Sequence, residues 1–76
     1  MVDVGRMPLG SHLRAAREAA GLTQSEVAER AGIHRVHISV LEHDRKSPTM
    51  DVFIRICRAV DVLPSAILKK IEAERP

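Results

Sequence analysis

The side chains best suited to bind another molecule are concentrated between positions 24 and 46. The second half of this stretch carries three cations and three histidines, namely Arg35, Arg45, Lys46, His34, His37 and His43. Guanidinium, ammonium and imidazole groups donate hydrogen bonds, which suits them to phosphate oxygens and to the acceptor atoms of guanine. These residue types favour an anionic partner.

Two other kinds of chemistry are poorly supported by the same residues. His34 and His37 are three positions apart, but two nitrogens are too few for a structural zinc site, and no cysteine or third histidine has a firm spacing. No Ser–His–Asp arrangement, pair of carboxylates or phosphate-binding loop can be assembled from the polar residues. We therefore expect no metal, no cofactor and no enzymatic activity.

The apolar pattern places these side chains on two short helices. Apolar residues recur at helical spacing on both sides of Gly32, at Val27, Ala28, Ala31, Ile38 and Leu41. Only glycine enters the left-handed backbone conformation without a steric cost, so we expect Gly32 to end the first of these helices. The pattern predicts a helix-turn-helix, whose second helix has an outward face of Arg35, Val36, Ser39 and Val40, with His37 at its edge.

Over residues 13–68 the sequence resembles the phage repressor and Cro-like helix-turn-helix domains, also called xenobiotic-response-element-type regulators. The segment LRAAREAAGLTQSEVAERAGI is similar to the first two helices of that family, HISVLE to its recognition helix and RKSPTMDVFIRICRAVDV to its fourth helix. The stretch HRVHIS also resembles the recognition helix of restriction–modification controller proteins. The resemblance implies an all-α, five-helix, lambda-repressor-like domain that binds double-stranded DNA.

The residues expected to contact DNA are Gln24, His34, Arg35, Val36, His37, Ser39, Val40, His43, Arg45 and Lys46. Arg35 would grip guanine, and Val36 and Val40 would meet thymine methyl groups in the major groove. Arg45 and Lys46, just past the recognition helix, would clamp the phosphate backbone. The alternative is a face for a protein partner, because two valines and a histidine can also meet an apolar surface.

The resemblance also implies structural roles for polar residues. Arg17 would be held by Glu42 in an ion pair that fixes the angle between two helices, and the amide of Gln24 would brace the recognition helix while its helix end docks on a phosphate. Asp44 and Asp61 stand where the family often has glycine. Aspartate tolerates the left-handed conformation better than most residues, so we expect both turns to survive.

The remaining sequence predicts a short N-terminal arm over residues 1–8 and one domain over residues 9–76. The first helix should begin at residue 9 or 10, with Ser11 as its cap, and Thr23 with Glu26 predicts a capping box on the next. Thr49 is a suitable cap for a fourth helix, and Pro64 suits the start of a fifth. The fourth helix repeats apolar residues at helical spacing, at Met50, Phe53, Ile56, Cys57 and Val60.

The end of the chain carries more apolar surface than a small core would bury. Ile54, Leu63, Ile67 and Ile71 are therefore predicted to form a subunit interface. The single cysteine, Cys57, is predicted to be a buried small hydrophobe, because it offers no disulfide within the chain.

Length and composition bound the function without specifying it. Seventy-six residues make one small domain, and a net charge of +2 neither requires nor excludes nucleic acid. No apolar run is long enough for a membrane span or a signal peptide, so we expect a cytoplasmic protein. The predicted function is a DNA-binding transcriptional regulator that acts as a homodimer on a palindromic operator. An antitoxin-type or protein-interaction module of the same fold is the alternative, and a toxin or other protein partner stays open.

Overall fold

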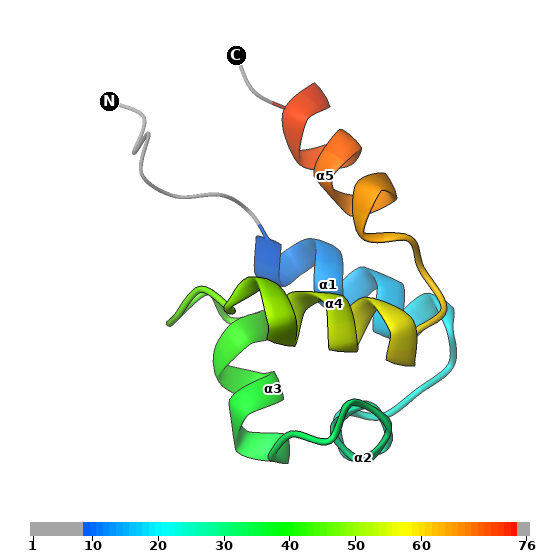
Figure 1. Cartoon of the computed structure of the whole chain (residues 1–76), viewed down its shortest axis with the longest axis vertical. Coiled ribbons are helices and arrows are strands. Elements are labelled where there is room, and N and C mark those ends of the chain that lie inside the picture. Colours follow the sequence, from blue (N-terminus) through cyan, green and yellow to red (C-terminus); the bar gives the residue numbers. More distant parts are fainter. Residues whose placement is uncertain (1–8, 75–76) are drawn as a thin grey trace.

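The computed structural model describes residues 9–74, and within them the chain forms five helices and no strand (Figure 1). The helices are α1 (Leu9–Ala19), α2 (Gln24–Ala31), α3 (Arg35–Glu42), α4 (Met50–Ala59) and α5 (Pro64–Ala73). This is the all-α, five-helix fold that the sequence predicts. The predicted arm over residues 1–8 lies outside the described residues. No helix in the described part is long and apolar enough to cross a membrane.

Threonine caps fix where two of the helices begin. The Thr23 hydroxyl accepts the Glu26 N–H at 3.1 Å, and the Glu26 carboxylate accepts the Thr23 N–H at 2.9 Å. This is the predicted capping box, and the bond from the Thr23 N–H lowers the pKa of Glu26 below its ordinary value. Thr49 caps α4 as predicted. Ser11, however, lies inside α1, so its predicted role as a cap is wrong.

The first four helices end in the same backbone motif, which requires a residue in the left-handed conformation. Those residues are Gly21, Gly32, Asp44 and Asp61, with φ of 72°, 70°, 56° and 58°. After each of them, the next N–H donates to the carbonyl five positions earlier, at 2.9–3.1 Å. The predictions that Gly32 ends its helix and that both aspartates adopt this conformation are confirmed.

The core is formed by thirteen buried apolar residues drawn from all five helices: Leu13, Val27, Ala28, Ala31, Ile38, Leu41, Phe53, Ile56, Cys57, Ala59, Val60, Ile67 and Ile71. Burial raises the pKa of the Cys57 thiol to about 11, as expected for a cysteine that packs as a hydrophobe. Helix α2 packs on α3 and α4, while α1 packs on α3 and α5. In Figure 1, α5 lies on the opposite side of α1 and α4 from α2 and α3. The two helices of the helix-turn-helix therefore share one end of the molecule.

Two residues predicted for the subunit interface belong to this core instead. Ile67 and Ile71 are 2% and 4% exposed, because α5 folds back onto α1 and α4. Their burial within one chain removes the reason for assigning them to an interface. Leu63 is 71% exposed and Ile54 is half-buried, so these two remain accessible. Met50 is 65% exposed and does not extend the inward face of α4.

Candidate nucleic-acid interface

The start of α3 is fixed by a histidine. His34 has an extended backbone, and its ring Nδ1 accepts the N–H of Val36 at 3.3 Å. An accepting Nδ1 carries no proton, so in the neutral ring the proton sits on Nε2, which is left as a donor. The sequence predicts His34 as a DNA contact near the helix start and does not reveal this capping role. A helix cap by histidine is uncommon, since Ser, Thr, Asp and Asn lead at this position.

The two faces of α3 differ sharply. Ile38 and Leu41 are each 1% exposed and hold the helix to the core. On the outer side, Arg35 and Val36 are exposed, and Val36 is 55% exposed although it is apolar. The other outward residues differ in exposure, with His37, Ser39 and Val40 half-buried and His43 exposed. The structure thus brings the predicted reading residues onto one accessible helix face, with Arg35 and Val36 the most accessible of them.

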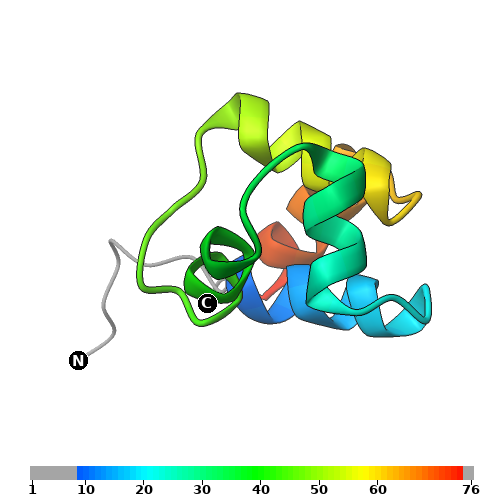
Figure 2. The ribbon, with the colours of Figure 1, turned by 90° about the horizontal axis from the view of Figure 1, so that it is seen from below.

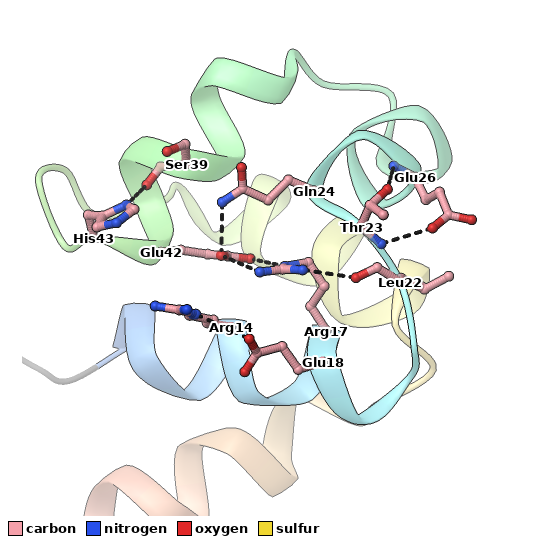
Figure 3. Close-up of polar contacts among 10 residues, drawn as sticks. All are labelled: Arg14, Arg17, Glu18, Leu22, Thr23, Gln24, Glu26, Ser39, Glu42 and His43. Carbon is pink, nitrogen blue, oxygen red and sulfur yellow. Dashed lines mark hydrogen bonds and ion pairs between the residues drawn. The ribbon is translucent and has the colours of Figure 1, made fainter.

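A charged cluster braces the last turn of α3 against α1 and α2 (Figure 3). Arg17 donates from Nε to Glu42 Oε2 at 2.7 Å and from Nη2 to Glu42 Oε1 at 3.1 Å. The Gln24 amide donates to the same Oε1 at 3.1 Å, and Arg17 Nη1 donates to the Leu22 carbonyl at 2.9 Å. Both the predicted ion pair and the predicted bracing role of Gln24 are present.

Because the cluster is largely buried, it constrains the orientation of α3. Glu42 is only 8% exposed, so its carboxylate depends on its partners to replace water. The hydrogen bond to Glu42 raises the pKa of Arg17, against the opposing effect of its partial burial. A two-bond guanidinium–carboxylate pair fixes orientation as well as distance. The cluster therefore sets the direction in which α3 presents its outer face.

A second clamp joins the end of α3 to the start of α1. The Gly10 N–H donates to Asp44 Oδ1 at 2.8 Å. A methyl group added at Gly10 would lie 2.5 Å from the Glu42 carbonyl oxygen and 2.6 Å from that of Leu41. Only a residue without a side chain allows this approach. The sequence shows Gly10 as an ordinary residue near a helix start and contains no signal of the contact.

The loop over residues 43–49 places two cations next to the end of α3. Arg45 and Lys46 are both exposed, as required for phosphate contacts. Arg45 follows the left-handed residue of its turn, and the corresponding residues after α1, α2 and α4 are apolar and half-buried: Leu22, Ile33 and Val62. At this one turn a charged side chain replaces an apolar contact with the core. The position therefore exposes a cation just beyond the end of α3.

The histidines of this surface do not gather into a group of metal-ligand side chains within the described part of the chain. Among residues 9–74, no group of three or more His, Cys, Asp or Glu side chains could hold a metal ion. The imidazole of His43 is engaged by the Ser39 carbonyl at 2.8 Å. Polar groups on this face are arranged along a helix and a loop, which is the arrangement for contacts to an extended partner.

Comparisons with known proteins agree with this geometry. Residues 13–67 match the family model described as Helix-turn-helix. The chain is 33% identical over 69 residues to the HTH-type transcriptional regulator ImmR of Bacillus subtilis. The alignment covers 91% of this chain and 54% of ImmR. It is 31% identical over 62 residues to the immunity repressor protein of Bacillus phage phi105, covering 82% of this chain and 43% of that protein. The chain thus spans about half the length of these curated relatives.

Solved structures show the same fold. The clp gene regulator ClgR from Corynebacterium glutamicum aligns with a TM-score of 0.86 at 25% identity, covering 99% of this chain and 97% of that one. The restriction–modification controller protein C.AhdI from Aeromonas hydrophila aligns with a TM-score of 0.76 at 24% identity, covering 80% and 92% of the two chains. The chain therefore belongs to the helix-turn-helix family of repressor-like transcriptional regulators.

Proposed function

We propose that the chain binds a palindromic operator in double-stranded DNA as a homodimer and thereby regulates transcription in the cytoplasm. The observation that carries the proposal is the outer face of α3, where exposed Arg35 and Val36 stand on a helix whose other face is fixed. Val36 is 55% exposed although its side chain is apolar. The same pair suits the major groove, where a thymine methyl and a guanine edge can lie on neighbouring base pairs.

Each predicted residue then has a defined task. Arg35 reads guanine through two hydrogen bonds, and Val36 and Val40 contact thymine methyl groups. The remaining residues act on the backbone: His34 through its Nε2 donor, Gln24 through its second amide N–H, and His37, Ser39, His43, Arg45 and Lys46 nearer the phosphates. The backbone contacts position the protein, and the base contacts specify the sequence.

The dimer contact is proposed at a groove between the end of α4 and the start of α5. Its lining includes Ile54 and Leu63 together with Val62 and Pro64. A two-fold interface pairs one patch with itself, so these apolar residues meet their own copies across it. The apolar residues supply the buried area. In such a dimer the two copies of α3 should lie about 34 Å apart, one helical turn of DNA.

Selection of bound duplexes from a random pool tests the proposal. We expect an inverted repeat with half-sites about 10 base pairs apart, each with one guanine position that the Arg35→Ala variant no longer prefers. That variant should lose about 1–3 kcal/mol per half-site on the selected operator and less on unrelated DNA. Recovery of no enriched sequence would contradict DNA reading, and equal losses on operator and unrelated DNA would show that Arg35 contacts only phosphate.

A further inference from the structure

A second cationic cluster surrounds a shallow hollow between the last turn of α2 and the second half of α4. The hollow is lined by Arg30, Ala31, Arg55, Arg58 and Ala59. Ala31 and Ala59 are buried, and their small side chains let the two packed helices approach each other. Three exposed guanidinium groups from two helices therefore surround one hollow floored by methyl groups.

The cluster is short of counter-charge. Arg55 pairs with Asp51 at 3.2 Å, and Arg30 donates to the Ala59 carbonyl at 3.4 Å. The guanidinium of Arg58 makes no hydrogen bond or ion pair with any residue of the described range. The five lining residues carry three positive charges and no carboxylate, while Asp51 and Glu26 act on Arg55 and Arg30 from outside the hollow. Arg55 and Arg58 are three positions apart and share a helix face, so their like charges repel.

This cluster lies at the opposite edge of the molecule from the proposed phosphate clamp. Arg30 is six residues beyond Gln24 along α2, which corresponds to about 9 Å along the helix axis. In Figure 2 the ends of α2 and α4 meet at the upper right, whereas the loop over residues 43–49 runs at the left. Contacts to DNA through α3 and that loop therefore leave the cluster free, and the proposed dimer groove shares only Arg58 with it.

We propose that Arg30, Arg55 and Arg58 dock an acidic segment of a protein partner, with two carboxylates about one helical turn apart. The hollow is open and shallow, so a small anion would keep most of its surface in water, whereas a segment lies along both helices. Guanidinium groups bind carboxylates through two parallel hydrogen bonds, and arginine is enriched at protein interfaces. The alanine floor accommodates the apolar stems of the acidic residues.

Binding of a model peptide to the full chain tests this surface. The probe is a labelled helical peptide with two glutamates four positions apart, and its glutamine counterpart serves as the uncharged control. We expect the glutamate peptide to shift the Nε–H NMR signals of the three arginines. Arg58→Ala and Arg55→Ala should each weaken binding about two- to fivefold. The matched control is Arg14→Ala. Arg14 is also exposed and forms an ion pair with a carboxylate four positions away, as Arg55 does, and its removal should leave peptide binding unchanged.

Several results would overturn the proposal. Equal binding of the glutamine peptide would show that charge is not recognised. Equal losses in Arg58→Ala and Arg14→Ala would show only general attraction to a cationic surface. Shifts produced as strongly by inorganic phosphate at the same concentration would indicate a simple anion site, and shifts produced only by duplex DNA would make the cluster part of the DNA surface. The peptide, phosphate and DNA comparisons are made on the NMR signals of the unmodified chain. They therefore remain valid even if a variant is unstable.

Discussion

The close approach of α1 to α3 predicts that Gly10→Ala destabilises the protein, although helix propensity alone predicts the reverse. Alanine is favoured over glycine in a helix by at most about 1 kcal/mol. At Gly10 the added methyl would lie 2.5 and 2.6 Å from two backbone carbonyl oxygens, which cannot rotate away as a side chain would. The two helix ends must therefore move apart.

The magnitude follows from what that movement costs. Forcing one extra methyl into a packed contact costs about 1–3 kcal/mol, and the separation also lengthens the 2.8 Å bond from the Gly10 N–H to Asp44. After the propensity gain is subtracted, we expect a net loss of about 2 kcal/mol. Each kcal/mol should lower the melting temperature by about 4–8 °C in a domain of this size.

The assay is urea and thermal unfolding followed by circular dichroism at one fixed protein concentration, since dimerisation would make stability concentration-dependent. Ala15→Gly is the control: it is exposed on the same helix and should lose only the propensity difference of about 1 kcal/mol. Propensity alone predicts opposite signs for the two variants, whereas the structure predicts a loss in both. A Gly10→Ala protein at least as stable as its parent, with an unchanged urea slope, would refute the close contact.

Three further predictions concern charge, backbone and assembly. Replacing both Arg45 and Lys46 by alanine should weaken binding to all DNA sequences alike and reduce the slope of log affinity against log salt by about two units per protomer; an unchanged slope in a salt titration would exclude the loop from the interface. Asp61→Gly should stabilise the protein by about 0.5 kcal/mol, because glycine adopts positive φ freely. Asp44→Gly should instead lose about 1 kcal/mol with its bond to α1, so a gain in urea unfolding for both variants would mean that this bond contributes nothing. Leu63→Asp should remain folded but sediment as a monomer where the parent is a dimer, and a parent that is monomeric at high micromolar concentration would remove the proposed interface.

Local features of the fold were predictable because they depend on neighbouring residues. The capping box at Thr23 and Glu26 and the left-handed turn at Gly32 are each set within a few positions of the chain, whereas the turns at Asp44 and Asp61 were expected from the family resemblance. Such features follow from residue type and spacing.

Contacts between distant segments were harder to predict from the sequence. The spacing of Ile67 and Ile71 indicates that one face of α5 is covered, but periodicity does not say whether the cover is the same chain or a second copy. The pairing of Arg17 with Glu42 followed from the family resemblance and not from spacing, since 25 positions separate them. Nothing local marks Gly10, because its role depends on two carbonyl groups more than thirty residues away.

The two faces of α3 also determine how this regulator can change its target. Ile38, Leu41 and Glu42 hold the helix in place, while Arg35 and Val36 make no contribution to the core. Substitutions at sites without shared partners have nearly additive effects, so exchanges on the outer face leave the packing of the inner face intact. Under the proposed function, new operator preferences would therefore arise from replacing outward residues alone, without compensating changes elsewhere in the chain. The packing of the five helices can stay constant while the proposed base-reading residues change.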